Sequence, residues 1–176
     1  MRKEAAQEWR ITMKKVDLHV HSTYSDGTNT PKELIKLAEN EGLSAITLTD
    51  HDTLDGIPDA LMQLKTASVE LIPGVELSTN FNNTEVHIVG LFLDHNNKQI
   101  NDYLIYQRQS RIDRNIQMCQ KFCDIGINIT YDKMCELYPD AVITRAHFAD
   151  YLVKTNIQVI EMKPLTDIYH LESPVL

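Results

Sequence analysis

Residues 15–28, KVDLHVHSTYSDGT, decide how the rest of the chain is interpreted. Apolar and polar residues alternate along 16–20, a pattern that is typical of a strand. The two kinds of residue then lie on opposite faces of this strand: Val16, Leu18 and Val20 on one, Asp17, His19 and His21 on the other. Because Gly27 permits a tight reversal in the SDG turn that follows, we expect Asp26 to lie close to the strand end.

Strand and helix patterns alternate through the first half of the chain. Thr30 and Pro31 have the character of an N-cap and a first helical residue, and Gly42 ends the helical pattern that they begin. We predict strands at 16–20, 44–49, 70–77 and 85–93, a helix at 31–41, and a short helix that follows Asp55-Gly56 and runs through residues 59–67. This order predicts an α/β fold with βα units in a parallel sheet or barrel. Polar residues at the strand ends would then gather on the face where barrel enzymes carry out their chemistry.

The second half of the chain is predicted to be helical. Residues 98–123 have the apolar spacing of a long amphipathic helix that ends near Gly126. Shorter helices are predicted at 131–138, after Thr130, and at 145–153, where Thr144 has the character of an N-cap. No internal repeat or low-complexity tract interrupts this order.

The composition excludes several classes of function. The chain has 176 residues, enough for one compact domain, and a net charge of −8, which argues against binding to duplex DNA or to an anionic membrane. It contains no run of about 18 apolar residues and no apolar segment behind its N-terminal charges, so we expect neither a membrane span nor a secretory signal. Cys119, Cys123 and Cys135 form no CxxC pair and are predicted to be reduced thiols of a cytoplasmic protein.

Histidines and carboxylates recur at the predicted strand ends in an order that suits metal binding. Two imidazoles in an HxH pair on a strand point to one side and can share one ion. The candidate ligands are His19, His21, Asp26, His51, Glu76 and His87. Taken singly, these residues are explained equally well without a metal, as a surface histidine pair, a turn aspartate or a hydrogen-bonded histidine. Only the whole set predicts a metal site. Glu76 could bridge two ions, and Asp50 or Asp52 could fix the tautomer of His51.

The same residues carry a resemblance to a known family. The stretch DLHVHSTYSDGTNTPKELIKLAENEGLSAITLTDHDTLDGI, followed by IPGVELS and EVHIVGLFLD, resembles the PHP family, the polymerase and histidinol phosphatase domain. The likeness covers about residues 15–153, includes ITRAHFADYL, and points to the branch of small phosphoesterases that act on nucleotides and short RNA ends. It implies the N-terminal part of a distorted (β/α)7 TIM-like barrel with a helical insertion.

The resemblance also implies the centre and its residues. Two or three divalent ions (Zn, Mn or Fe) would be held by the six candidate ligands. Arg145 and His147 are implied to contact the phosphate, and His147 to assist the leaving group. A guanidinium at a helix N-terminus suits an anion on physical grounds as well, whereas a surface arginine and a partly buried helix histidine are the plain alternative.

The chain departs from the family pattern after residue 153. The His-Pro segment and the late Asp-x-His pair of the family are absent, and His170, the only histidine there, is expected to face solvent. The sequence predicts four parts: an extension at 1–12, with Met13 as an alternative start, a barrel part at 13–97, a helical insertion at 98–153, and a divergent tail at 154–176. We expect either a shortened product of a longer gene or an association of two chains that covers open strand edges.

The expected function is hydrolysis of a phosphomonoester or a terminal phosphodiester on a nucleotide-like substrate, through a metal-activated water. An amidohydrolase-like barrel also opens with HxH on its first strand, although the SDG turn, the DHD segment and the strand glutamate fit it less well. A metal-binding remnant without turnover, or an accessory domain of a polymerase, is the alternative from another class.

Overall fold

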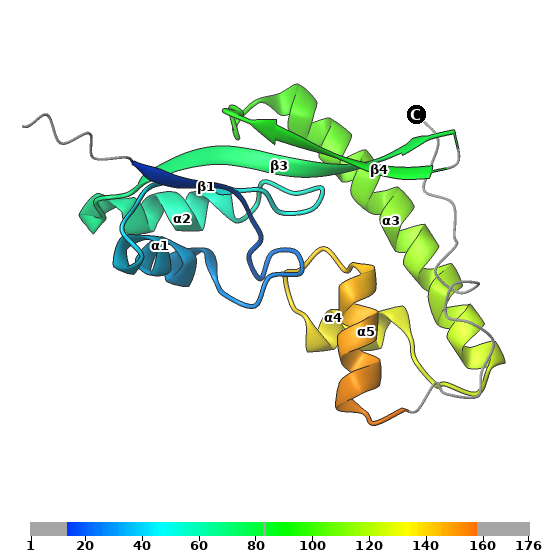
Figure 1. The fold of residues 1–176 in the computed structure, drawn as a ribbon. Helices are drawn as coiled ribbons and strands as arrows, with labels where there is room; N and C mark the ends of the chain where they lie inside the picture. Colours follow the sequence, from blue (N-terminus) through cyan, green and yellow to red (C-terminus); the bar gives the residue numbers. More distant parts are fainter. Residues whose placement is uncertain (1–13, 83, 158–176) are drawn as a thin grey trace, which may run out of the picture.

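The computed structural model describes residues 14–82 and 84–157 of the chain (Figure 1). The predicted extension at 1–12 lies outside the described residues, as does His170 with most of the predicted tail. Among the helices of the described part, none combines the length and the apolar character needed to cross a bilayer.

Four strands form one open, curled sheet in the order β1-β2-β3-β4. They span Lys15–Val20, Leu43–Leu48, Glu70–Phe81 and Thr84–Leu91. The pairs β1–β2 and β2–β3 are parallel, so the α/β class with parallel βα units is confirmed for these three strands. The carboxyl ends of β1 and β2 therefore open toward the same edge of the sheet.

The fourth strand does not continue the parallel order of the first three. β4 pairs with β3 in antiparallel register, with Glu76 opposite Val89 and Ser78 opposite His87. Only two residues separate the strands, whereas a parallel crossover needs a dozen or more. The hairpin thus places His87 beside the residues of β3 that follow Glu76.

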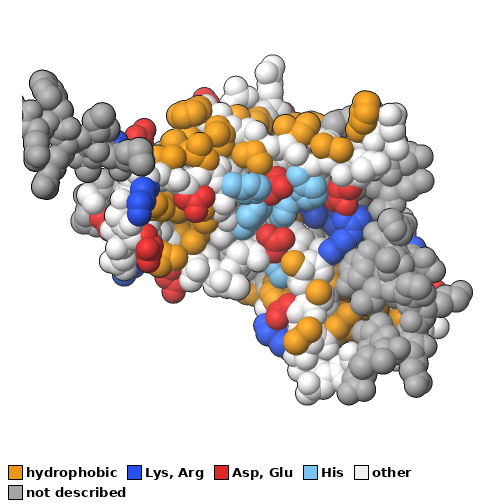
Figure 2. Space-filling view, viewed as in Figure 1, with side chains coloured by type: hydrophobic (Ala, Val, Ile, Leu, Met, Phe, Trp, Pro, Cys, Tyr) orange, Lys and Arg blue, Asp and Glu red, His pale blue; other side chains and the backbone are white. Residues whose placement is uncertain are grey.

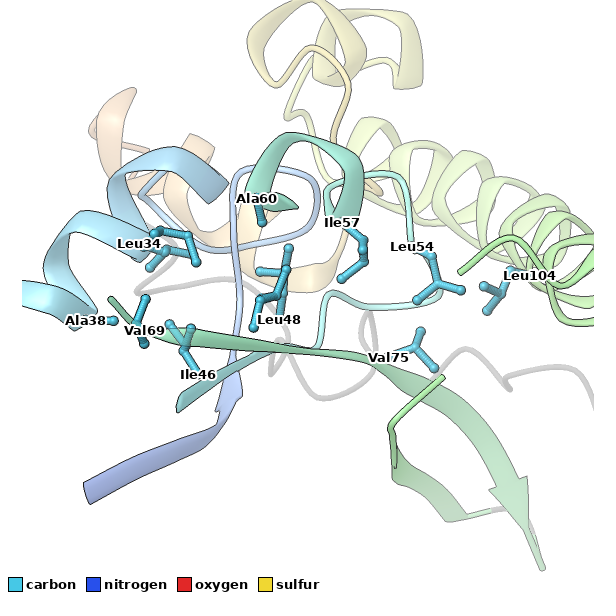
Figure 3. Packing of buried hydrophobic residues seen from close by; sticks show 12 residues of the cluster. Leu34, Ala38, Ile46, Leu48, Leu54, Ile57, Ala60, Val69, Val75 and Leu104 are labelled. Atoms are coloured by element: carbon cyan, nitrogen blue, oxygen red, sulfur yellow. The ribbon is translucent and has the colours of Figure 1, made fainter. Parts of the chain in front are cut away.

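Two helices and a short 3-10 turn cover one face of the sheet. Helix α1, Pro31–Asn40, begins with the predicted Thr30 cap, in a capping box with Glu33. Helix α2, Ile57–Gln63, begins directly after Gly56, as predicted, and continues into η1, Leu64–Thr66. Figure 3 shows Leu34 and Ala38 of α1 and Ile57 and Ala60 of α2 packed toward Ile46, Leu48, Val69 and Val75 of the sheet region.

Three helices form a second hydrophobic cluster beside the sheet. They are α3, Lys98–Asp124, α4, Tyr131–Leu137, and α5, Arg145–Lys154, close to the predicted ranges. Phe122 and Phe148 stack at its centre with ring centroids 5.9 Å apart. Leu104 of α3 belongs instead to the sheet cluster, so α3 is a member of both cores. The boundary between barrel part and insertion stays a prediction.

Contacts tie the helical region to the loop after β1. The Val142 amide donates to the Tyr24 carbonyl at 2.8 Å. Within the helical region, the Asn115 side chain of α3 donates to the Ile143 carbonyl at 2.8 Å and holds the segment that carries Val142. The outer strand β1 is less covered, because its Val16 and Leu18 remain 50% and 41% exposed.

Candidate metal centre

All six predicted ligands converge on one patch of the surface. His19 lies on β1, Glu76 on β3 and His87 on β4, while the others lie in loops after strands: His21 and Asp26 after β1, and His51 after β2. Figure 2 shows histidines gathered with acidic side chains near the middle of one face, next to a group of basic side chains. The convergence follows from strand order, since β1, β2 and β3 are neighbours and His51 forms a parallel bridge with Glu76.

Glu76 is the hub of this patch. Its Oε2 lies 2.8 Å from His19 Nε2, 3.0 Å from His21 Nε2 and 3.7 Å from His51 Nδ1. Its Oε1 lies 3.0 Å from His87 Nδ1. One carboxylate is thus surrounded by four imidazoles, with two of them also in mutual contact, because the Nε2 atoms of His19 and His21 are 3.1 Å apart.

Asp26 forms the opposite side of the patch. Its Oδ1 lies 3.5 Å from His21 Nδ1, and its Oδ2 lies 3.5 Å from His51 Nε2. The Thr144 hydroxyl at the start of α5 donates to Oδ2 at 3.0 Å. The turn that carries Asp26 is tight, since the Gly27 amide donates to the Ser22 carbonyl at 2.9 Å.

The six residues fit divalent ions. Three overlapping groups each bring their ligand atoms within 4.8 Å of one another: His19, His21 and Glu76; His21, Asp26 and His51; His51, Glu76 and His87. Mixed imidazole and carboxylate donors suit Zn, Mn or Fe. His51 Nδ1 is buried without a hydrogen-bond partner. Buried polar atoms seldom lack a partner, so a bound ion would explain this one. Because His21, His51 and Glu76 each belong to two groups, the arrangement suits neighbouring ions rather than one isolated ion.

The protonation states also suit ligation. Burial lowers the pKa of His51 to about 4, although the negative charge of Asp26 acts to raise it. The imidazole of His51 is therefore neutral near pH 7. Burial alone would raise the pKa of Glu76, but the hydrogen bond with His19 and the charges of the nearby imidazoles lower it. Burial opposes ionisation of Asp26 in the same way, and the imidazoles of His51 and His21 bring its pKa below the usual value. Both carboxylates are therefore ionised.

The two aspartates beside His51 do not fix its tautomer as expected. Asp50 accepts hydrogen bonds from Ser22 and Ser25, and burial raises the pKa of this carboxyl despite them. Asp52 accepts from the Ser78 amide at 2.9 Å and pairs with Arg111 of α3. Their backbones instead hold the loop to β3, because the Asp52 amide donates to the Glu76 carbonyl and the Glu76 amide to the Asp50 carbonyl.

Arg145 and His147 lie next to the patch on the first turn of α5. The Arg145 guanidinium pairs with Glu85, whose other oxygen is 3.7 Å from His87 Nε2. His147 is only 7% exposed, and its Nδ1 accepts the Thr144 amide at 2.9 Å in a capping box. Burial lowers the pKa of His147, so its ring is neutral as this cap requires. Their contact with a phosphate stays a prediction.

Sequence reasoning missed several polar residues that support the patch. Arg111 and Arg114 are both buried, and Arg114 Nη1 lies 3.7 Å from Glu85 Oε1. Burial, together with the charges of Arg111 and Arg145, lowers the pKa of Arg114 to about 9. The available signal was the three-residue spacing of these arginines, which places them on the helix face that also carries Leu104 and Met118.

Comparisons with known proteins agree with this geometry. A family model described as PHP domain matches residues 17–164. The chain is 42% identical over 141 residues to a 5'-3' exoribonuclease of Haemophilus influenzae, covering 80% of this chain and 51% of that protein. It is 35% identical over 144 residues to a 3',5'-nucleoside bisphosphate phosphatase of Chromobacterium violaceum, covering 80% and 50%.

A solved structure shows the same fold. A protein of Bifidobacterium adolescentis, provisionally described as a metal-dependent phosphoesterase, superposes with a TM-score of 0.79 at 25% identity, over 92% of this chain and 59% of that one. The predicted fold, the N-terminal part of a TIM-like barrel with a helical insertion, is thereby confirmed. The chain spans about half the length of the curated relatives it matches.

Proposed function

The chain belongs to the PHP domain family, and from this premise we propose that it is a metal-dependent phosphoesterase. The proposed reaction is hydrolysis of a phosphomonoester or a terminal phosphodiester of a nucleotide-like substrate by a metal-activated water. The names of the exoribonuclease and the bisphosphate phosphatase support this substrate class.

One observation carries the proposal: Glu76 lies among four imidazoles at a strand end, within three overlapping groups of ligand atoms. A carboxylate in that position can bridge two ions and keep them close together. We propose that the ions are held by His19, His21, Asp26, His51, Glu76 and His87. When bound, two divalent ions supply Lewis acidity for the attacking water and for the phosphate oxygens.

The residues around the patch have roles that their positions support. Arg145 reaches the patch through Glu85 and His87, so its guanidinium would bind and orient a phosphate beside the ligands. Arg114 shares Glu85 and would add positive charge on the same side. His147 would hold the start of α5 in place through its cap with Thr144, and in the proposed reaction it would contact the phosphate or assist the leaving group.

The test combines metal content with turnover. Protein purified after growth with Mn²⁺ or Zn²⁺ is analysed for ions per chain, and phosphate release is then measured from adenosine 3',5'-bisphosphate, AMP and p-nitrophenyl phosphate. We expect about two ions per chain and release from the bisphosphate. Glu76→Gln should lose both bound ions and activity, while Glu70→Gln, an exposed carboxylate on the same strand, should keep them.

The outcomes separate the alternatives. Stoichiometric ions without turnover on any of the three substrates would overturn the proposed hydrolysis of phosphomonoesters, and the same result with a short 5'-phosphorylated RNA would favour a metal-binding protein without catalysis. Turnover of amides rather than phosphates would favour an amidohydrolase. If wild-type protein that unfolds cooperatively on heating contains no bound ions, the proposed metal centre is wrong.

A further inference from the structure

A buried hydrogen-bond network lies directly beneath His21. Ser22 and Ser25 are fully buried and Asp50 is 2% exposed. Asp50 Oδ1 accepts the Ser22 amide at 2.6 Å and the Ser25 hydroxyl at 2.7 Å, and its Oδ2 accepts the Ser22 hydroxyl at 2.7 Å. The Ser25 oxygen in turn lies 3.3 Å from Nδ1 of His21. The network thus links Asp50, which is not among the proposed ligands, to His21, which is one of them.

The direction of each hydrogen bond follows from the donors. The Ser22 oxygen already accepts the Tyr24 amide at 3.1 Å, so the Ser22 hydroxyl hydrogen is free to point to Asp50. Ser25 has two neighbours, Asp50 at 2.7 Å and His21 at 3.3 Å. Because a carboxylate is the stronger and nearer acceptor, the Ser25 hydrogen points to Asp50, and the Ser25 oxygen offers a lone pair to His21.

This polarity selects one form of the His21 ring. A lone pair facing Nδ1 favours the tautomer with hydrogen on Nδ1, which leaves the lone pair of Nε2 unprotonated. Nε2 is the atom that lies 3.0 Å from Glu76 Oε2 and 3.1 Å from His19 Nε2. The tautomer therefore presents the ligand lone pair toward the hub of the patch, where an ion would bind.

We propose that Asp50, acting through Ser25, is the positioning residue that sets the tautomer and orientation of His21 for metal binding. The proposal rests on the metal centre of the proposed function but not on the phosphoesterase reaction. Partners of this kind, behind a ligand, commonly change metal affinity 10- to 100-fold when removed. A second acceptor faces Nδ1, since Asp26 Oδ1 lies 3.5 Å away, so the experiment has to separate Ser25 from Asp26.

The first measurement needs no variant. Imidazole ¹⁵N–¹H correlation spectra of the full chain without metal, at about pH 8 where imidazoles are neutral, report the tautomer of each histidine. The His21 signals are assigned by their loss in His21→Gln. We expect His21 with hydrogen on Nδ1. Hydrogen on Nε2 would overturn the proposal.

The second measurement uses Ser25→Ala with Ser68→Ala as its matched control, because Ser68 is exposed and bonds only Glu39 in the described hydrogen bonds. In Ser25→Ala we expect a mixture of His21 tautomers and a Zn²⁺ affinity, by calorimetry, that is lowered about tenfold. Ser68→Ala should match the wild type. Asp50→Asn should change the tautomer in the same direction.

Each further outcome decides the proposal. If Ser25→Ala keeps the Nδ1 hydrogen and binds Zn²⁺ within twofold of the wild type, Asp26 sets the tautomer and the proposal is wrong. If either variant melts too early for calorimetry, the wild-type spectrum decides. Loss of phosphoesterase activity leaves these readouts unaffected, so failure of the two proposals is distinguishable.

Discussion

At the residue scale, single atoms decide whether the ligand loop can form. Gly27 is the clearest case, because a Cβ there would lie 2.1 Å from the His21 carbonyl oxygen and 2.8 Å from the Ser22 nitrogen. Both neighbours are backbone atoms, one of the proposed ligand His21 and one of the residue after it, so the clash cannot be relieved by a side-chain rotation. Relief requires the turn that carries Asp26 to open.

We therefore predict that Gly27→Ala lowers the free energy of unfolding by about 1–3 kcal/mol and weakens Zn²⁺ binding. Urea denaturation and calorimetry measure the two effects. Gly90→Ala is the matched control, because the nearest atom to its Cβ would be 3.6 Å away, an ordinary contact. If Gly27→Ala and Gly90→Ala were equally stable, the close approach of residue 27 to the His21 backbone would be contradicted.

A second prediction at this scale concerns pH. The Tyr24 hydroxyl donates to Asp59 Oδ2 at 2.8 Å, and this hydrogen bond raises the pKa of Tyr24 to about 12, from 10.0. A pKa that is raised in the folded protein stabilises it fully below about pH 10, and this stabilisation is lost as the pH rises toward 12. Tyr24→Phe lacks this contribution at every pH.

We expect the difference in unfolding free energy between wild type and Tyr24→Phe to be about 1 kcal/mol near neutral pH and to shrink above pH 10. Denaturant unfolding at a series of pH values measures it. Tyr106→Phe, on the exposed side of α3, serves as control and should show a small difference throughout. A Tyr24 difference that stays constant to pH 12 would contradict the assigned hydrogen bond.

At the element scale, one helix fastens the loop that carries His51. Arg111 of α3 donates through Nε to Asp52 Oδ2 at 3.1 Å and through Nη2 to the Ser78 hydroxyl at 2.5 Å. Both charged partners are buried, at 7% and 2% exposure. Asp52 has a positive φ of 53°, an uncommon conformation that these contacts and the Ser78 amide hold in place. Helix α3 thus links the second hydrophobic cluster to the candidate metal centre.

Removal of Arg111 should be costly, because it leaves a buried carboxylate without its cation. We predict that Arg111→Met lowers the free energy of unfolding by about 3–5 kcal/mol and that adding Asp52→Asn restores part of the loss. Arg108→Met is the control, one turn earlier on α3, where the pair with Asp55 is more exposed and worth about 0–1 kcal/mol. Chemical denaturation measures all of these variants. A similar loss in both single variants would contradict the proposed role of the Arg111–Asp52 pair.

At the scale of the whole molecule, the sheet leaves an edge uncovered within the part of the chain that the structure describes. β1 pairs only with β2 and ends the strand order, and its Val16 and Leu18 side chains are about half exposed. An unpaired edge with apolar side chains is a site for association with another strand. The curated relatives are about twice as long as the region that matches this chain.

We predict concentration-dependent self-association through β1, measured by sedimentation velocity. Val16→Lys should shift the chain toward monomer, because a charge on an edge strand opposes pairing. Leu37→Lys, on the exposed side of α1, is the matched control and should leave association unchanged. A wild-type chain that stays monomeric at every concentration tested would rule out the prediction.

The sequence by itself determined the elements and the ligand types. Apolar spacing predicted every strand and helix of the described chain to within a few residues, because local periodicity and caps such as Thr30 and Thr144 are written in neighbouring residues. The HxH pair, the SDG turn, the DHD segment, the strand-end glutamate and the strand histidine indicated the six candidate ligands for the same reason, because the chemistry of imidazoles and carboxylates can be recognised from residue type and spacing.

Only the tertiary structure decided which atoms meet. The antiparallel pairing of β4 with β3 placed His87 against Glu76. Asp50 accepts a hydrogen bond from Ser25 and Asp52 pairs with Arg111, so neither carboxylate fixes the tautomer of His51. The residues of these contacts are separated by about 10 to 60 positions in the chain. Their meeting depends on strand order, helix docking and competition among polar partners for buried space, none of which leaves a local pattern that the sequence can display.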